Sequence, residues 1–285
     1  MVGQRVTEAQ REVLRDKLGL NDPFMVKYGR FLKGAVHGDW GTSFIFKKPA
    51  LEVILSKLVA TLELVFGASL IIVVLSIPLG VYSAIHPRSF LTKCIMGASI
   101  IGISVPVFLT AILLMYLFSV QLDWLPSYGR GETLNLLGWD SGFFTWDGIQ
   151  HLILPSVALS SIMLPLFIRL VRSEMLEVLS SEYVKFAWAK GLDKKKVWYQ
   201  HALKNTMLPV ITVGGVQIGT MVAYTILTET VFQWPGTGFL INTAIFQRDI
   251  PLLQGTILVL CMFFVVLNLL VDILQPLIDP RMGRS

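Results

Sequence analysis

Histidine is the side chain best suited to acid–base catalysis or metal binding at neutral pH, and this chain of 285 residues contains four. His37, His86, His151 and His201 lie too far apart to share a helical turn, and the zinc-protease spacing His-Glu-x-x-His is absent. The Gly-x-Ser-x-Gly turn of hydrolases and the Gly-x-x-x-x-Gly-Lys-Ser/Thr loop of ATP-binding proteins are also absent. The sequence therefore predicts no enzyme, and a chain that binds no metal, ATP or other cofactor itself.

The two cysteines, Cys94 and Cys261, are the remaining candidates for metal or redox chemistry. Both fall in strongly apolar runs, and no partner lies at a metal-binding or redox-active spacing. We therefore expect both to be small buried hydrophobic residues.

Composition places these residues in a membrane protein. The chain is 54% hydrophobic and 15% charged, whereas a soluble domain has about 25% charged residues. The sequence contains five apolar runs that are long enough to cross the hydrocarbon core of a bilayer, which is about 30 Å thick. We expect an all-α integral membrane protein with Pro106 as a kink inside its second span. The predicted spans cover about 58–85, 94–122, 152–171, 206–228 and 252–273, within a transmembrane domain 58–278.

The positive charges predict the orientation of these spans. Twelve Lys and Arg residues lie in 86–93, 169–205 and 281–285, whereas the loops 123–150 and 232–251 hold only Arg130 and Arg248. Because positive loops stay on the cytoplasmic side, we expect the Lys-rich stretch and the tail 279–285 in the cytoplasm. Residues 1–57 would then be external, with a short amphipathic helix at Thr7–Leu18. In a membrane protein, the net charge of +5 is explained by the positive loops that set the orientation of the spans, and it does not indicate nucleic-acid binding.

The Lys-rich stretch between the third and fourth spans, 174–205, has the pattern of two short helices around a glycine. Ser180 or Ser181 can cap the first helix, with Glu182 in its first turn. Gly191 suits the left-handed position after that helix, and Asp193 can cap the second.

Inside the first of these helices, Val184, Ala187 and Trp188 share a face. The second helix is bounded by Pro209 or joined there to the next span. The stretch is either a solvated loop that fixes topology or a surface where a cytoplasmic partner docks.

The Lys-rich stretch 174–205 also resembles a segment of a known protein family. The residues Ala187-x-x-x-Gly191 and His201-Ala202-Leu203-x-Asn205 resemble the cytoplasmic coupling loop of ABC importer permeases, in the form found in the dipeptide/oligopeptide/nickel family. Lys185-Phe186 replace the first two residues of the general Glu-Ala-Ala opening, and Lys204 replaces a proline. Both departures are typical of the peptide branch.

Other segments carry the same resemblance. They are Leu18–Pro23, Gly38–Ser43, Trp234-Pro235-Gly236-Thr237-Gly238 and the terminal Asp279-Pro280-Arg281. In that family the first two segments follow a first membrane span, which we expect to be missing from this chain.

The resemblance implies a type I importer bundle in the cell inner membrane. It implies a second homologous permease, two cytoplasmic ATP-binding subunits that hydrolyse ATP, and an external or periplasmic substrate-binding protein as partners, with peptides as substrates. Import of nickel, another small metal chelate or glutathione is the alternative within the family, and a channel or scaffold without ATP coupling is the alternative outside it.

The resemblance also implies roles for individual residues. The segment Glu182–Asn205 would sit in a groove of the ATPase, with Ala187, Ala189 and Gly191 permitting close approach. Closure of the ATPase would then move the flanking spans. Leu192 and His201 belong to the same expected coupling surface.

Polar and small residues near the spans leave two interpretations open. Gly215 and Gly219 in the fourth span permit close approach of another helix, and Gln217 and Thr220 either line a polar pathway or join helices. Glu63 and Glu229, with the Trp234-Pro235-Gly236 turn, either form the outer mouth of a pathway or make structural hydrogen bonds and a turn.

The external loop 123–150 is rich in aromatic and acidic residues. It is either an interfacial aromatic belt or a docking rim for a protein that delivers substrate. Its aromatic residues are Trp124, Tyr128, Trp139, Phe143, Phe144 and Trp146, and its acids are Asp123, Glu132, Asp140 and Asp147.

Overall fold

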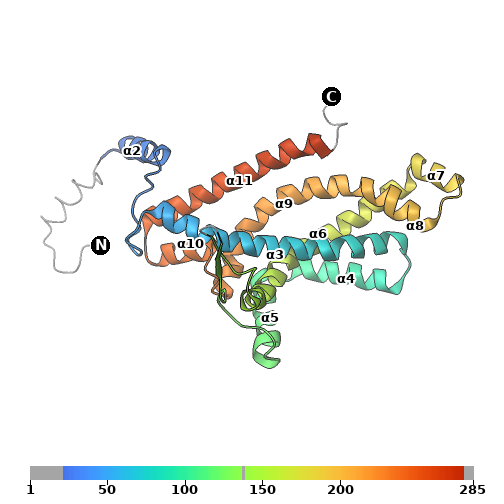
Figure 1. The fold of residues 1–285 in the computed structure, drawn as a ribbon, viewed down its shortest axis with the longest axis horizontal. Coiled ribbons are helices and arrows are strands. Elements are labelled where there is room, and N and C mark those ends of the chain that lie inside the picture. Colours follow the sequence, from blue (N-terminus) through green and yellow to red (C-terminus); the bar gives the residue numbers. More distant parts are fainter. Residues whose placement is uncertain (1–21, 137–138, 279–285) are drawn as a thin grey trace, which may run out of the picture.

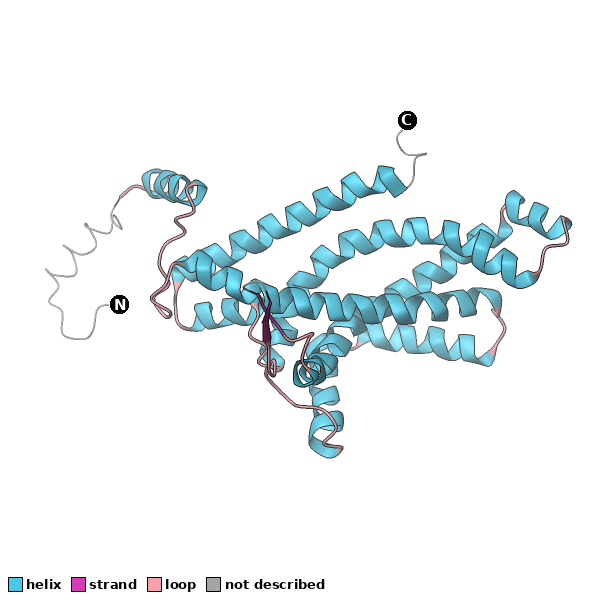
Figure 2. Cartoon of the chain, in the orientation of Figure 1, coloured by secondary structure: helices cyan, strands magenta, loops and turns pink. Residues whose placement is uncertain are grey.

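The computed structural model of the protein describes residues 22–136 and 139–278, so the expected helix at Thr7–Leu18 lies outside the described part. These described residues form an elongated bundle of helices, with a short two-stranded hairpin at its side (Figures 1 and 2). In chain order the elements are α2 (Phe24–Val36), α3 (Ala50–Ile85), α4 (Phe90–Ser104), α5 (Val107–Leu114), the π-helix η1 (Met115–Gln121), β1 (Leu134–Leu136), β2 (Trp139–Ser141), α6 (Trp146–Ser180), α7 (Glu182–Ala189), α8 (Lys194–Lys196), η2 (Val197–Ala202), α9 (Leu203–Val231), α10 (Thr237–Phe246) and α11 (Ile250–Ile278).

The largest buried cluster is built mainly by α3, α6 and α9. It includes Leu64, Leu159 and Met175, all with no exposed side-chain surface, and Met221 at 2%. Apolar residues cover every side of α3, which is typical of a helix buried among protein and lipid. By contrast, α2 has no buried residue in this chain.

Among the described residues, four helices are long and apolar enough to cross a membrane: Ala50–Ile85, Trp146–Ser180, Lys194–Val231 and Ile250–Ile273. Three of them extend well beyond the apolar runs that mark them in sequence. The helix containing the predicted span 58–85 begins at Ala50, and the one containing 152–171 continues to Ser180. Hydropathy marks the part of a helix inside hydrocarbon, whereas backbone hydrogen bonding continues into the polar layers.

The second apolar run is not one straight span, and the sequence-based expectation of a kink at Pro106 understates the change. Helices α4 and α5–η1 meet at an angle of 108°. Val105 adopts an extended conformation (φ −91°, ψ 123°), because a residue before proline avoids the helical region. With 15 residues, α4 is about 22 Å long, and the chain then leaves sideways along α5 (Figure 1).

At the external end, according to the predicted orientation, one aspartate joins the segment before α3 to the start of α11. Asp249 is fully buried, and its Oδ2 accepts hydrogen bonds from the Ser43 hydroxyl at 2.7 Å and from the amides of Phe44 and Ile45 at 2.8 and 3.1 Å. Its Oδ1 accepts from the amide of Leu252 at 3.3 Å. Two segments about two hundred residues apart are therefore fixed together.

Candidate coupling surface and external junction

The Lys-rich stretch folds as a compact unit at one end of the bundle (Figure 1). Helix α7 follows α6 after Ser181 alone, and Gly191 adopts the left-handed conformation (φ 76°) expected after a helix. The Asp193 side chain accepts a hydrogen bond from the amide of Lys195 at 3.1 Å, which is the predicted cap. The second helix continues through η2 into α9, with Pro209 inside it.

The predicted serine cap of α7 does not form. The hydroxyls of Ser180 and Ser181 instead donate to the carbonyls of Glu177 and Val178, in the last turn of α6. Serine hydroxyls commonly bond back to a preceding carbonyl in this way. Glu182 lies in the first turn as expected and forms an ion pair with Lys185 at 2.8 Å.

A small apolar core holds α7 to its neighbours. Val184 and Val197 are completely buried, and Ala187 is 6% exposed. The Ala187 side chain therefore faces its own protein, and the expected close approach of a partner at this residue stays a prediction. Trp188 lies one helical turn after Val184, on the same side of α7, and is 37% exposed.

The accessible face of α7 is aromatic and basic. Tyr183 and Phe186 are 44% and 61% exposed, and the Lys190 ammonium lies 4.5 Å from the centroid of the Phe186 ring. Asn205 donates to the hydroxyl of Tyr183 at 2.7 Å, which links α7 to α9. Of the other residues predicted here, Ala189, Gly191 and His201 are exposed, and Leu192 packs partly against the small core.

The glycines of α9 permit the close helix contact that the sequence predicts. A Cβ at Gly215 would lie 2.5 Å from the Val271 side chain, and one at Gly219 would lie 2.6 Å from the Phe264 ring. Both partners belong to α11, so the two helices approach with no space for a methyl group.

A cavity of about 650 Å³ opens beside this contact, between α3, α6 and α9. Its lining is mostly apolar and includes Phe167, Met207 and Ile218. Gln217 is among its polar lining residues, together with Ser69 and Ser76, whereas Thr220 is not part of the lining.

At the opposite end of α9, Glu229 is fully buried and holds the turn before α10. Its carboxylate accepts hydrogen bonds from the Thr61 hydroxyl at 2.7 Å and from the amide of Phe239 at 2.9 Å. Thr61 also accepts from the amide of Thr237 at 2.7 Å. A carboxylate is well placed at the N-terminus of α10, where amides lack helical partners.

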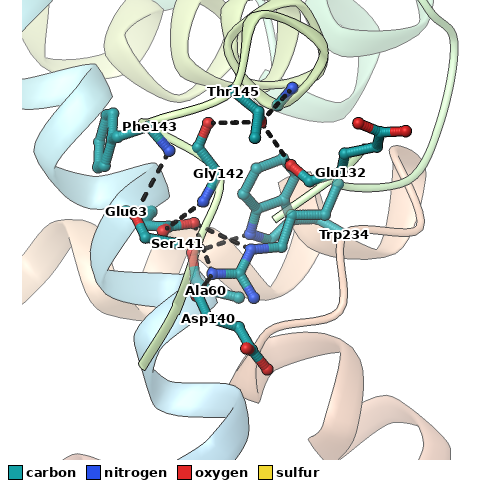
Figure 3. A network of polar contacts seen from close by, with 11 residues as sticks. Ala60, Glu63, Glu132, Asp140, Ser141, Gly142, Phe143, Thr145 and Trp234 are labelled. Carbon is teal, nitrogen blue, oxygen red and sulfur yellow. Dashed lines mark hydrogen bonds and ion pairs between the residues drawn. The ribbon is translucent and has the colours of Figure 1, made fainter. Parts of the chain in front are cut away.

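The neighbouring carboxylate, Glu63, is 6% exposed and forms an ion pair with Arg130. Its Oε1 accepts from the amide of Gly142 at 3.0 Å, as Figure 3 shows. Trp234, also fully buried, donates its indole N–H to the carbonyl of Ala60 at 2.8 Å. Glu63, Glu229 and Trp234 are thus buried and hydrogen bonded, as the structural interpretation expects, and Pro235 and Gly236 belong to the same turn. An outer mouth of a pathway at these residues stays a prediction.

Sequence reasoning did not pair Arg130, Thr61 or Asp249 with these partners. Arg130 did offer a signal, because it is the only basic residue in the loop 123–150 and stands between two glycines. The sequence pattern does not show which helix lies beside this loop, so it could not identify Glu63 as the partner of Arg130.

The two cysteines differ from expectation, since Cys94 and Cys261 are both exposed in the single chain. They lie on the apolar helices α4 and α11, and in a membrane protein an apolar side chain can leave water without burial in its own chain. Within the described residues, no group of three or more His, Cys, Asp or Glu side chains is arranged to hold a metal ion.

Comparison with known families gives a match over most of the chain. The model of the family described as binding-protein-dependent transport system inner membrane component matches residues 76–284. The dipeptide transport system permease protein DppB of Alkalihalophilus pseudofirmus is 40% identical, over 99% of this chain and 88% of its own. The oligopeptide transport system permease protein AppB of Bacillus subtilis is 38% identical, over 99% and 87%.

Solved structures show the same fold at low identity. An inward-facing form of the MetNI methionine ABC transporter has a chain that superimposes with a TM-score of 0.65 at 14% identity, covering 81% of this chain and 98% of that one. A chain of an amino acid ABC transporter crystallised with histidines gives 0.54 at 13% identity.

Proposed function

This chain belongs to the family of binding-protein-dependent transport system inner membrane components, and from that membership we propose that it is the permease of an ABC importer for dipeptides or oligopeptides. The observation that carries the substrate class is the nearly full-length similarity to relatives named for dipeptide and oligopeptide transport. The chain is a multi-pass membrane protein and a transport subunit, so catalysis of ATP hydrolysis belongs to other subunits.

The proposed assembly pairs this chain with a second homologous permease, two cytoplasmic ATP-binding subunits and an external substrate-binding protein. The similarity to chains from ABC transporters supports it. The distribution of positive charge supports a cytoplasmic position for 174–205 and for the C-terminus. The external loops then include 123–150 and 232–251.

The contact with the ATP-binding subunit is made by the exposed face of α7. Tyr183, Phe186 and Lys190 recur at helical spacing and project from a helix that is fixed to its own chain. Large aromatic residues with few side-chain torsions are common anchors at interfaces. Ala189 and Gly191 are accessible beside this face, whereas the Ala187 side chain is covered by its own chain.

Movement of α7 would be transmitted to the spans through two connections. The small core of Val184, Ala187 and Val197 ties α7 to α6 and η2, and the bond from Asn205 to Tyr183 ties it to α9. Because α6 and α9 also build the main core, a displacement imposed by ATP-driven closure would reach the pathway.

The experiment that tests this function is peptide uptake into proteoliposomes that contain the complete transporter. When the complex is purified through a tag on this chain, Phe186→Ala should reduce recovery of the ATP-binding subunits by about tenfold or more. The same variant should reduce ATP-dependent dipeptide uptake by a similar factor. Tyr28→Ala removes a comparably exposed aromatic residue (50%) from α2, outside the coupling segment, and should preserve both.

Three results would contradict the proposal. Uptake of Ni²⁺ without uptake of dipeptides would reject the substrate class. Failure to recover ATP-binding subunits with the wild-type chain would reject the coupling to ATP. Equal recovery with Phe186→Ala and with wild type would reject α7 as the anchor.

A further inference from the structure

Both external loops contact the same turn of α3, residues 60–63. The last loop reaches it through the indole of Trp234, which bonds to the Ala60 carbonyl, and through the Thr61 hydroxyl. The loop 123–150 reaches it through Arg130 and the amide of Gly142. Figure 3 shows two of these contacts, from Trp234 to Ala60 and from Gly142 to Glu63.

Arg130 is held in a geometry that only a guanidinium fits. Its Nη2 and Nε lie 2.7 and 2.9 Å from Oε2 of Glu63, and Nη2 also donates to the carbonyl of Asp140. The exposed fractions of the two side chains are 11% and 6%. An ammonium group would keep the charge but would lack this planar fork.

The backbone around Arg130 is shaped for this contact. Gly129 and Gly131 both have positive φ, 87° and 70°, which other residues rarely adopt. The amide of Gly129 donates to the carbonyl of Phe232, at the end of α9, at 2.9 Å. Arg130 therefore stands where the loop is fixed to α3 and to α9 together.

The ion pair positions an aromatic edge beside α3. Trp139 and Phe144 are 61% and 63% exposed, and they border a cavity of about 630 Å³ whose other lining includes Glu63 and Phe66. Phe143 contacts Phe66 edge to face, with ring centroids 5.6 Å apart. We name Trp139 and Phe144, with the cavity between them and α3, the aromatic edge.

The charge around the aromatic edge favours a protein partner over lipid headgroups. Glu132 and Asp140 are exposed on the same loop, and the positive charge of Arg130 is already paired with Glu63. An acidic surface does not attract a phosphate-rich headgroup layer, but it complements a protein surface that carries Lys and Arg.

We propose that Arg130 is a positioning residue: its buried ion pair with Glu63 holds the aromatic edge in the orientation that meets the substrate-binding protein. The inference rests on the proposed function, in which an external binding protein delivers the substrate. Arg130 itself touches neither that protein nor the substrate. It acts by fixing Trp139, through the bond to Asp140, against α3.

The test measures ATP hydrolysis by the complete transporter in nanodiscs while the peptide-loaded binding protein is titrated. Arg130→Gln should raise the half-saturating concentration of binding protein about tenfold and leave the rate without binding protein unchanged. Arg130→Lys should give an intermediate shift, because it keeps the charge without the fork. Trp139→Ala should raise the half-saturating concentration to a similar extent.

Two further variants separate positioning from general damage. Glu63→Gln combined with Arg130→Gln should be no worse than Arg130→Gln alone, because that single change already removes both the ion pair and the bond to Asp140. Lys48→Gln breaks an ion pair with Glu52 that is also on α3 but exposed (63% and 59%), and it should leave the titration unchanged.

The outcomes distinguish the inference from the function on which it rests. If binding protein does not stimulate the wild-type transporter, the proposed function itself fails. If the wild type responds and Arg130→Gln gives the same half-saturating concentration, the positioning role is overturned. An unchanged titration for Trp139→Ala would identify the aromatic edge as a membrane belt and would also overturn the inference.

Discussion

Gly191 illustrates how a single backbone conformation can be tested at the residue scale. Its φ of 76° belongs to the left-handed region, and no atom lies within 4 Å of where a side chain would begin. A substitution there meets no steric clash within this chain, so two side chains that differ in their tolerance of this backbone conformation can isolate the backbone effect. We expect Gly191→Val to cost about 1–2 kcal/mol locally and to shift α7, reducing ATP-dependent peptide uptake.

Gly191→Asn is the matched control, because asparagine tolerates the left-handed region better than branched residues. Uptake by the asparagine variant should stay near the wild-type rate. If the valine variant transports peptide as well as wild type does, the rigid connection between α7 and α8 is not needed for coupling.

Glu229 makes a second prediction at this scale. Its carboxylate has no exposed surface and accepts from Thr61 and from the amide of Phe239. Glu229→Ala would leave these donors buried without an acceptor, so we expect the free energy of unfolding to fall by about 2–3 kcal/mol. Thermal unfolding of the detergent-solubilised chain measures this as a lower midpoint.

The neighbouring residue provides the control for that experiment. The hydroxyl of Thr228 is buried and has no hydrogen-bond partner among the described residues. Thr228→Val should therefore leave the midpoint unchanged or raise it, because it removes an unsatisfied polar group of similar size. A loss equal to that of Glu229→Ala would show that the site is sensitive to any change.

The sequence pattern identifies the two buried acids but not their hydrogen-bond partners. Glu63 and Glu229 stand out as acids in apolar runs, and hydrogen bonding was one of the two interpretations open for them. Their partners lie 67 and 168 positions away in sequence. No local pattern encodes such a distance, because it depends on which helices become neighbours.

At the scale of elements, the contact between α9 and α11 depends on glycine. Gly215→Ala would place a methyl group 2.5 Å from Val271, and overlap of this kind costs about 1–3 kcal/mol. We expect a lower unfolding midpoint and looser contact between these helices.

Gly214→Ala is an adjacent control. Its methyl group would lie 3.6 Å from the Phe167 ring, an ordinary contact, and alanine is favoured over glycine in a helix by up to about 1 kcal/mol. Its midpoint should equal or exceed that of wild type. Equal losses for the two variants would exclude close helix contact as the reason.

The elements themselves were only partly predictable. All five apolar runs lie in helices, because apolar side chains and satisfied backbone groups are both required in hydrocarbon. The 108° bend at Pro106 was not predictable in size, since a proline weakens a helix but the direction of the next segment depends on where it packs. Here α5 contributes Ala111 to a cluster with Leu154 and Phe232.

At the scale of the whole molecule, burial is distributed unevenly among the helices. In its most apolar window, α6 is 61% buried within the chain, whereas α11 is 11% buried, and α2 buries no residue. Hydrogen–deuterium exchange should therefore be slowest in α6 and fastest in α2, because local opening is easiest where few contacts must break.

This order of exchange can be measured on the isolated chain in detergent. Protection of α2 equal to that of α6 would contradict it. In the assembled transporter, any additional protection of α11 relative to the isolated chain would identify it as a surface that other subunits cover.

The length of α6 has a mechanical consequence. Its 35 residues make a rod about 52 Å long, which exceeds the hydrocarbon core of about 30 Å. Pro155 and Pro165 interrupt its hydrogen bonding in the interior and leave both ends regular. A tilt of about 5° around the middle would swing each end by roughly 2 Å, and in opposite directions. If α6 tilts as one body about its middle, a push at Ser180 therefore moves Trp146 in the opposite direction.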